Sequence, residues 1–519
     1  MLYEKKGTGE MKDYILSVDL GTTSIKQALV TAEGTILASS SREYELLTPE
    51  SSWVECSEDT YWEAFKSGLK EVLEKTGSTA ENIRALGISA QGETFFCMGG
   101  DGRILRNAIV WMDNRAMEEA DELRNVFSDE LCYRKTGQVS FDPCWPASKL
   151  LWLRRKEPEL FKKTKKFMLM EDWLIWRLTG RIVSEGSLLC STVYWDINTK
   201  RYWPEMLAYL GIGEEQLPEI LEPGTAAGTV TDSAAQETGL SVNTTVCTGA
   251  LDQAAGAIGA GNIKEGIISE NIGAALAICA PVKKPVFDPN QVMPLHYFGL
   301  PDMYMLHTFT TGGMALKWFR DTFCTEEKSV SRLTGINAYD LINSEADRIP
   351  EGCDGLRVLP HLSGSMAPDV NPKAKGVVYG FTLKHTKAHF GRAIMESIGF
   401  IVRRNIEALE NMGLGFQEIR SLGGGSRSHV WNQIKADINQ KELAIAGGDE
   451  AACLGAAVLA GTAVGIFSGA EDAVKRIAGV RRRYYPRSEK KEVYDMAYAD
   501  YKQLFSGLDE VFETTYRGK

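Results

Sequence analysis

The chain lacks several patterns that define other classes of enzyme. Its ten cysteines are scattered without a Cys-x-x-Cys pair, which argues against zinc and thioredoxin-type sites. No Gly-x-x-x-x-Gly-Lys-Ser/Thr motif occurs, and the glycine run at residues 423–425 does not fit Gly-x-Gly-x-x-Gly with its downstream acid. Neither a P-loop enzyme nor a Rossmann dehydrogenase is therefore supported. The six histidines show no metal-ligand spacing.

The chain also has fewer basic residues than acidic ones. Lysine and arginine together number 58 against 69 aspartates and glutamates, for a net charge of −11. Because nucleic-acid binding needs a basic surface, we expect no nucleic-acid partner. Residues 1–12 are polar and charged and do not resemble a secretory leader, so we expect a cytoplasmic protein with buried, reduced cysteines.

Only one stretch is long and apolar enough to suggest a membrane. Residues 451–470 carry no charge, but acidic residues flank them and neither a basic flank nor an aromatic belt is present. We interpret this stretch as a buried helix and turn, with no membrane partner.

What is present fits a large globular chain. Of the 519 residues 44% are hydrophobic and 24% charged, and the 50 glycines exceed the usual share of about 7%. At roughly 150 residues per domain this length predicts two or three domains.

The order of predicted elements indicates a mixed α/β fold. Residues 14–18, 25–31 and 35–40 predict an antiparallel meander, and apolar residues from Trp62 to Leu73 recur at helical spacing. Short strands are expected at 85–89 and 108–111. A similar strand followed by a glycine turn begins again near residue 245, so we expect two related domains that meet near residue 255.

The first strand leads into Asp19 and the turn Gly21, Thr22, Thr23, Ser24. A glycine turn with three hydroxyl residues can donate N–H and O–H groups to phosphates, and an adjacent aspartate suits a hydrated magnesium ion. Lys26 could add a positive charge there. The alternative is an ordinary hairpin turn with Asp and Thr as capping residues.

A second carboxylate, Asp252, lies between a small-residue turn and a small-residue helix. A ligand could approach it closely, which makes it a candidate base for a hydroxyl group. The alternative is a helix cap, because aspartate is common before an alanine-rich helix.

Two further groups of residues could contact ligands. The glycines at 423–425 stand between a predicted strand and a predicted helix, the general layout of a nucleotide pocket. Amide, carboxylate, indole and guanidinium groups at the ends of two predicted strands could bind a polyhydroxylated ligand, although ordinary surface loops have the same composition. These residues are Gln91, Glu93, Trp111, Asp113 and Arg115.

Taken together and in order, these motifs resemble the FGGY carbohydrate kinases. The resemblance also includes Gly376 to Phe381 and the segment from Ala393 to Glu396, and it covers about residues 13–505. It implies an α/β fold of two actin-like, ribonuclease-H-like ATPase domains with an interdomain cleft for ATP and sugar. The expected domains are residues 13–255, residues 256–485 and a helical tail at 486–519.

The resemblance also implies roles for individual residues. Asp252 would be the general base, Asp19 would bind Mg²⁺ through water, and Gln253 would join the candidate sugar ligands. The residues expected to bind ATP are Asp19, Gly21, Thr22, Thr23, Ser24, Lys26, Gly273, Ala274, Gly313, Lys317, Gly424, Gly425 and Ser428.

Two departures from the family pattern bear on these roles. Glycerol-kinase-like members carry an arginine where this chain has Gly92, so we expect a substrate larger than glycerol. Members that phosphorylate xylulose usually carry Met-His in this loop, where Gly92 and Glu93 stand here. Ala274 replaces a common hydroxyl residue of the second phosphate turn.

The predicted activity is transfer of the γ-phosphate of ATP to a ketopentose or related sugar or polyol. A glycerol- or erythritol-type polyol kinase is the alternative, and an actin-like ATPase without sugar kinase activity is a more distant one. The expected partner is a small sugar or polyol, and the resemblance leaves a homodimer open.

Overall fold

The computed structural model describes residues 13–77, 80–448 and 450–515. The described chain forms two compact units. Unit 1 comprises residues up to 259, residues 297–302 and residues 450–478, and unit 2 comprises the remainder. Residues 450–478 thus pack in unit 1, although the sequence division assigns them to the C-terminal domain. That division stays a prediction, and the polar segment 1–12 lies outside the described residues.

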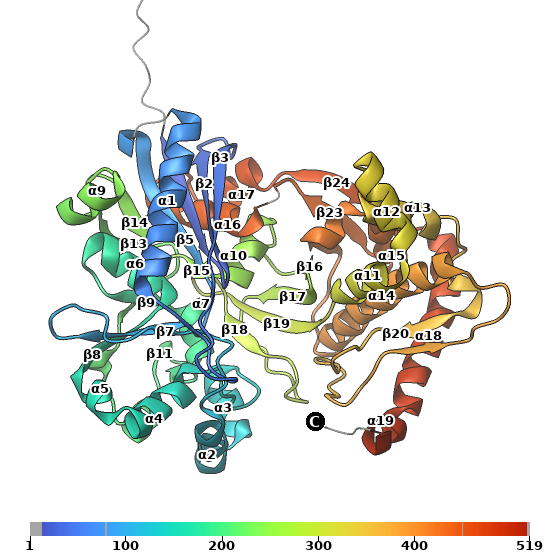
Figure 1. Ribbon diagram of the computed structural model, residues 1–519, viewed down its shortest axis with the longest axis horizontal. Helices are drawn as coiled ribbons and strands as arrows, with labels where there is room; N and C mark the ends of the chain where they lie inside the picture. The colour runs from blue at the N-terminus through green and yellow to red at the C-terminus, as the bar shows by residue number, and fades with distance from the viewer. Residues whose placement is uncertain (1–12, 78–79, 449, 516–519) are drawn as a thin grey trace, which may run out of the picture. The chain divides into compact units, whose positions relative to one another are not determined.

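Unit 1 is built on a large mixed sheet whose strand order is β13-β14-β5-β1-β2-β3, with β15 also paired to β5 (Figure 1). β1, β2 and β3 form the predicted antiparallel meander, while β5 runs parallel to β1 and to β14. The bounds are β1 (Tyr14–Leu20), β2 (Ser24–Thr31), β3 (Ile36–Glu43), β5 (Ile83–Ala90), β13 (Ala226–Thr229), β14 (Thr245–Cys247) and β15 (Ala250–Leu251).

Helices cover this sheet through their small and apolar faces. α1 (Glu58–Thr76) packs on β2 and β3 and buries Trp62, Phe65 and Leu69, as their spacing predicts. α16 (Ala451–Ala463) packs on β1, β5 and α10 (Asp252–Gly259). Because α16 is buried within unit 1, the interpretation of residues 451–470 as a buried helix and turn is confirmed.

A second, four-stranded sheet of unit 1 has the order β4-β7-β6-β8. The strand expected at 108–111 belongs to this sheet as β7. It ends at Ile109, because the chain turns where the Asp113 amide donates to the Val110 carbonyl. The bounds of this sheet are β4 (Glu55–Cys56), β6 (Phe95–Gly99), β7 (Ala108–Ile109) and β8 (Thr164–Leu169). The other helices of unit 1 are α2 (Met117–Phe127), α3 (Asp129–Thr136), α4 (Pro146–Lys156), α5 (Pro158–Lys163), α6 (Met170–Thr179), α7 (Gly186–Leu189), α8 (Pro204–Leu210), α9 (Asp232–Thr238) and α17 (Ala470–Ile477).

Unit 2 repeats the topology of the large sheet. Its sheet has the order β18-β19-β17-β16-β22-β23-β24, in which β18 is Leu295–Tyr297. β16, β17 and β19 are antiparallel, and β22 is parallel to both β16 and β23. The bounds are β16 (Ile267–Ile272), β17 (Ala275–Val282), β19 (Tyr304–Thr311), β22 (Glu418–Leu422), β23 (Glu442–Ala446), β24 (Val480–Tyr484), α11 (Met314–Phe323), α12 (Thr325–Thr334), α13 (Ala338–Ala346), α14 (Lys387–Asn411), α15 (His429–Asn439), α18 (Lys491–Gly507) and α19 (Asp509–Thr515).

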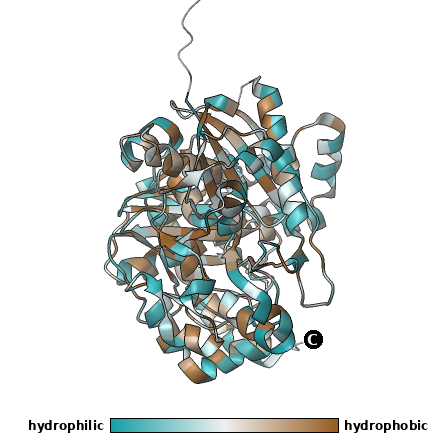
Figure 2. Cartoon of the chain, turned by 90° about the vertical axis from the view of Figure 1, so that its left-hand side faces the viewer, coloured by the Kyte–Doolittle hydropathy of each residue, from teal (hydrophilic) through white to brown (hydrophobic). Residues whose placement is uncertain are grey.

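The two sheets therefore share a plan in which an antiparallel three-stranded meander is extended by parallel strands from its first strand. This agrees with the expectation of two related α/β domains. Hydrophobic residues gather in the strands, and hydrophilic residues colour much of the outer helices (Figure 2). In each unit the turn that follows the first strand of the meander carries candidate ligand-binding residues.

Candidate active site

Asp19 lies near the carboxyl end of β1, between β2 and β5. One of its carboxylate oxygens accepts a hydrogen bond of 2.8 Å from the Ser89 hydroxyl of β5. Burial raises the pKa of Asp19, while Ser89 and the charge of Lys26 act in the opposite direction. Asp19 is partly exposed and is held by Ser89 through one carboxylate oxygen.

The turn after β1 is tied to neighbouring loops. The Gly21 amide donates to the Ser24 carbonyl over 3.1 Å, and the Gly21 carbonyl accepts from the side-chain amide of Gln91 over 3.0 Å. The Thr22 hydroxyl accepts from the Trp111 indole over 2.9 Å. Two candidate sugar residues thus brace the candidate phosphate turn.

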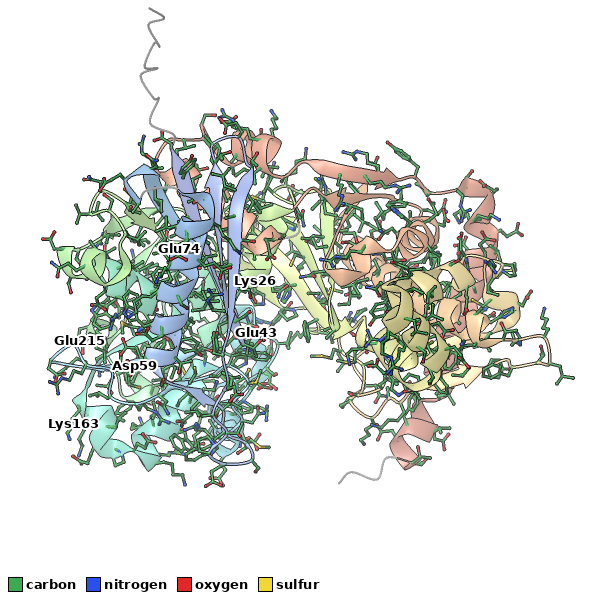
Figure 3. The ribbon with its side chains drawn as sticks, turned by 45° about the horizontal axis from the view of Figure 1, so that its top comes forward. Lys26, Glu43, Asp59, Glu74, Lys163 and Glu215 are labelled. Carbon is green, nitrogen blue, oxygen red and sulfur yellow. The ribbon has the colours of Figure 1, made fainter. Side chains whose placement is uncertain are left out.

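Lys26 on β2 forms an ion pair of 3.1 Å with Glu450 (Lys26 is labelled in Figure 3). Burial lowers the pKa of Lys26, but Glu450 and Asp19 more than offset this and the pKa is raised. Lys26 therefore stays positively charged beside the phosphate turn. Its role as a phosphate ligand stays a prediction.

Asp252 is the first residue of α10, and one carboxylate oxygen accepts from the Gln253 amide over 2.7 Å. Burial raises the pKa of Asp252 to about 7, and the charges of Asp19 and Glu93 act in the same direction. The three carboxylates are therefore close enough to interact, although they are far apart in sequence. Asp252 is partly exposed, so a ligand can reach it.

Glu93 has a left-handed backbone with φ of 59°, unusual for a residue other than glycine, which directs this side chain from a strained turn. Burial raises the pKa of Glu93 to about 7, against the charge of Lys149. Lys149 is fully buried and donates to the carbonyls of Val110 and Trp111. One lysine thus supports both the Trp111 loop and Glu93.

Asp113 and Arg115 lie in the interior and form a two-pronged ion pair with bonds of 2.9 and 2.7 Å. Glu55 accepts from the same guanidinium, which also stacks 4.0 Å from the Trp53 ring. These contacts give both residues a structural role in the Trp111 loop, and direct contact with a sugar stays a prediction.

Three glycine-containing turns of unit 2 are packed against one another. The Gly313 amide donates to the Gly273 carbonyl over 3.1 Å, and the Met314 amide donates to the Ala274 carbonyl over 2.8 Å. Gly423 has φ of 72°, and a Cβ atom there would lie 2.4 Å from the Asn271 amide oxygen. Gly424 and Gly425 follow in a short 3-10 turn. Such backbone-lined turns suit phosphate and nucleoside binding.

Two polar residues of unit 2 that were expected to bind ATP form contacts with other residues of the same unit. Ser428 caps α15 by accepting from the Trp431 amide over 3.1 Å and also donates to the Asn343 side chain over 2.9 Å. Lys317 forms an exposed ion pair of 3.0 Å with Asp321. Contact of either residue with a nucleotide stays a prediction.

The roles of Ser89, Lys149 and Glu450 were not predicted from the sequence. Ser89 holds Asp19 and Glu450 pairs with Lys26, so both belong to the surroundings of the phosphate turn. Ser89 lies two residues before Gln91, at the end of the strand expected at 85–89, and this position was a signal for it. No sequence signal identified Lys149, because its partners are backbone carbonyls that only folding brings near.

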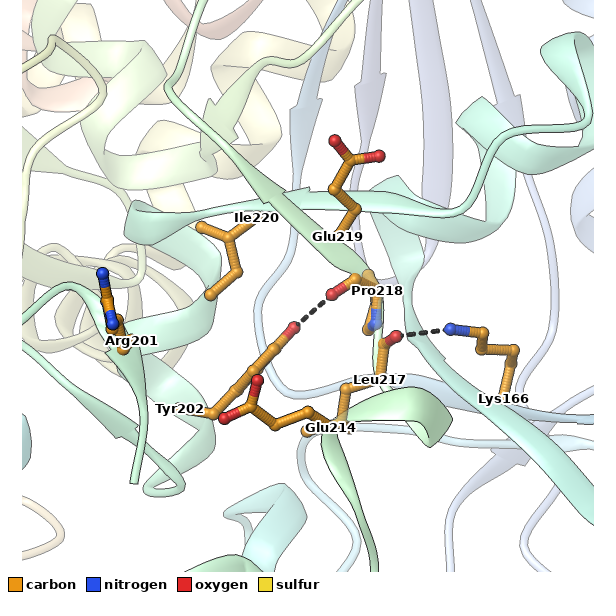
Figure 4. A pocket seen from close by; sticks show the side chains of 8 residues that line it. All are labelled: Lys166, Arg201, Tyr202, Glu214, Leu217, Pro218, Glu219 and Ile220. Carbon is orange, nitrogen blue, oxygen red and sulfur yellow. Dashed lines mark hydrogen bonds between the residues drawn. The ribbon is translucent and has the colours of Figure 1, made fainter. Parts of the chain in front are cut away.

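A pocket of about 470 Å³ in unit 1 lies apart from these residues (Figure 4). Its Tyr202 hydroxyl donates to the Pro218 carbonyl, and its Lys166 ammonium donates to the Leu217 carbonyl. None of its lining residues is a predicted site residue. Within residues 13–77, 80–448 and 450–515, no cluster of three or more histidine, cysteine or acidic side chains could hold a metal ion, and none of the helices is both long and apolar enough to cross a bilayer.

Comparison with known proteins identifies the family. Residues 14–259 match the N-terminal domain of the FGGY family of carbohydrate kinases, and residues 277–464 match its C-terminal domain. A xylulose kinase of Bacillus subtilis is 28% identical over 494 residues, covering 95% of this chain and 97% of the relative. A gluconokinase of Bacillus licheniformis is also 28% identical, over 98% and 97% of the two chains.

A solved structure supports the same conclusion. The chain is similar to a ligand-bound xylulose kinase from Lactobacillus acidophilus, with a TM-score of 0.87 and 26% identity over 97% of this chain and all of the other. The expected α/β fold with two actin-like domains is therefore confirmed. The chain belongs to the FGGY family of carbohydrate kinases and is a sugar kinase, an enzyme that transfers a phosphoryl group to a sugar.

Proposed function

We propose that this kinase transfers the γ-phosphate of ATP to a hydroxyl of an uncharged polyhydroxylated substrate, a ketopentose or a related sugar or polyol. The observation that carries the proposal is the group formed by Asp252, Asp19 and Glu93, which places a carboxylate of pKa about 7 beside two other acids. Sugar ligands and base lie in unit 1, and the glycine turns of unit 2 would bind the nucleotide.

Asp252 would act as the general base. Its carboxylate accepts the proton of the substrate hydroxyl as that oxygen bonds to the γ-phosphorus and the bond to ADP breaks. A pKa near neutrality suits this task, and general-base catalysis contributes roughly 10²–10⁴-fold. Lys26 and the amides and hydroxyls of residues 21–24 would bind phosphate oxygens.

Asp19 fits a magnesium ion. Mg²⁺ prefers oxygen ligands and keeps several waters while binding one or two carboxylates and substrate phosphates. Burial raises the pKa of Asp19, so a bound cation would favour the ionised carboxylate there. When bound, the ion would offset the negative charge of the transferring phosphoryl group, and Asp19 with its Ser89 partner would orient it.

The charge around Asp252 favours a neutral substrate over an aldonate. Glu93 and Asp19 each raise the pKa of Asp252, so the carboxylate of gluconate would enter a site that already repels negative charge. The relatives include both xylulose kinases and gluconokinases, so this distinction matters. A side chain at Gly92 would contact Leu251 at 3.0 Å and Ser191 at 3.4 Å, which disfavours the arginine of glycerol-kinase-like members.

A screen of ADP release tests the proposal. The purified kinase with ATP and Mg²⁺ is mixed in turn with xylulose, ribulose, glycerol, erythritol and gluconate. We expect the highest kcat/KM with a ketopentose. Preference for a small polyol would support the alternative, and preference for gluconate by tenfold or more would contradict the electrostatic argument.

A further inference from the structure

The segment that carries Asp252 is held by side chains from outside its own sheet. β15 has only two residues, and a Cβ atom at Gly249 would lie 1.6 Å from the Ile88 carbonyl, so the backbone runs directly against β5. The Gly249 amide donates to Glu171 over 2.8 Å, and the Leu251 amide donates to the Ser187 hydroxyl over 2.9 Å. Two side chains therefore fix the backbone immediately before the candidate base.

A glutamate orients the Ser187 hydroxyl. Ser187 donates its hydroxyl proton to Glu185 over 2.5 Å, and the Ser187 and Leu188 amides donate to the same carboxylate over 2.7 and 2.9 Å. Because the hydroxyl proton is committed to Glu185, a lone pair of the oxygen remains directed at the Leu251 amide. Glu185, Ser187 and Leu251 thus form a continuous chain of hydrogen bonds.

The carboxyl groups of Glu171 and Glu185 lie where burial disfavours their charged forms. Glu171, Glu185 and Ser187 are fully buried. Burial raises the pKa of Glu171 well above its usual range and that of Glu185 to about 7, and the proximity of the two glutamates acts in the same direction for Glu171. Buried polar groups are tolerated when they form hydrogen bonds, and here Glu171 and Ser187 each accept one from the backbone of residues 249–251.

The same segment also reaches the candidate sugar loop. Ser191 follows Ser187 by one helical turn, and its hydroxyl lies 3.4 Å from the position of a Cβ at Gly92, next to Glu93. Residues 185–191 therefore contact the surroundings of both Asp252 and Glu93.

We propose that Glu171 and the Glu185–Ser187 pair are positioning residues, which hold the amides of residues 249 and 251 and so fix the Asp252 carboxylate against the substrate hydroxyl. This inference rests on the proposed role of Asp252 as the base. Small displacements of a catalytic group reduce the chemical step, because the reacting atoms must be aligned.

Ser187→Ala tests the proposal directly. We expect kcat to fall about tenfold while the KM for ATP stays within about twofold, since only alignment of the base changes. Ser187→Thr retains the hydroxyl and should recover most of kcat. Thr192→Val is the matched control, because it removes a buried hydroxyl of the adjoining turn that donates to the Leu189 carbonyl.

Glu171 provides an independent pair of variants. Glu171→Gln retains an acceptor oxygen for the Gly249 amide, so near-native kcat is expected. Glu171→Met removes the acceptor and should lower kcat about tenfold. Comparison of Glu171→Gln with Glu171→Met tests the positioning role even if Ser187→Ala does not fold.

Two outcomes would overturn the proposal. One is native kcat in both Ser187→Ala and Glu171→Met, with folding verified by circular dichroism. The other is an equal fall in kcat in Thr192→Val, which would indicate a general loss of packing. Asp252→Asn, measured in parallel, separates the two hypotheses. If it is inactive while Ser187→Ala and Glu171→Met are both native, only the positioning role fails, and if it is fully active, the base assignment fails.

Discussion

At the scale of single residues, the carboxyl of Asp252 is partly exposed, yet burial and two neighbouring acids raise its pKa to about 7. Asp252→Asn keeps the shape of the side chain and the start of α10 but removes the proton acceptor. We expect kcat to fall at least about a hundredfold, with ATP binding retained. Steady-state kinetics and calorimetric titration with ATP would measure the two quantities.

A matched control exists for this substitution. Asp232 is likewise the first residue of a helix, α9, and no site role is proposed for it. Asp232→Asn should leave kcat within about twofold of the native value. Near-normal turnover of Asp252→Asn would remove Asp252 from the role of base.

The same carboxyl predicts the pH dependence. A base acts only when it is unprotonated, so activity should be present above pH 7 and be lost as the pH falls through about 7, the raised pKa of Asp252. A plot of kcat/KM for the sugar against pH would show this acid limb. Glu93 also has a pKa of about 7, so the limb must persist in Glu93→Gln if it belongs to Asp252.

At the scale of elements, small residues set how closely α16 approaches α10. A Cβ atom at Gly455 would lie 1.9 Å from the Ala255 carbonyl, whereas one at Gly256 would meet nothing within 4 Å. Gly455→Ala should therefore lower the free energy of unfolding by about 1–3 kcal/mol through overpacking. Urea unfolding would measure the change.

Gly256→Ala is the control for this prediction. Alanine has the higher helix propensity, so this variant should be unchanged or stabilised by up to about 1 kcal/mol. Equal effects of the two substitutions would show that helix propensity, and not the contact between α16 and α10, determines the result.

At the scale of the whole molecule, two sheets of the same topology carry different proposed ligands. Sugar alone should slow hydrogen exchange in peptides that contain residues 91–93, 111 and 249–253 of unit 1. ADP should slow exchange around residues 273–274, 313 and 423–428 of unit 2. Mass spectrometry of exchanged peptides would measure both effects.

The pocket around Tyr202 and Pro218 provides the internal control for the exchange experiment. Its peptides should exchange at the same rate with either ligand, because no lining residue is assigned to the site. Protection by sugar confined to unit 2 would contradict the assignment of substrate residues to unit 1.

Much of the plan could be predicted from local patterns. The meander of residues 14–40 and the helix with Trp62 and Leu69 depend on periodicity and turn residues, which are local properties. The repeat was expected to begin near residue 245, but the strand there is β14, which pairs with β5 in unit 1, and the second meander begins at β16. The motif order was enough to identify the family. The strand predicted at residues 108–111 is shorter in the structure, because the turn closed by the Asp113 amide and the Val110 carbonyl ends it after Ile109.

The sequence alone determined the fold class, the family and which side chains are candidates for chemistry, because these depend on residue types and their spacing. Only the tertiary structure decided that Asp19, Glu93 and Asp252 share one electrostatic environment and that Lys26 pairs with Glu450. It also decided that Glu171 and Ser187 hold the backbone before Asp252. Those relations join residues far apart along the chain, and pKa values and hydrogen bonds depend on distances that exist only after folding.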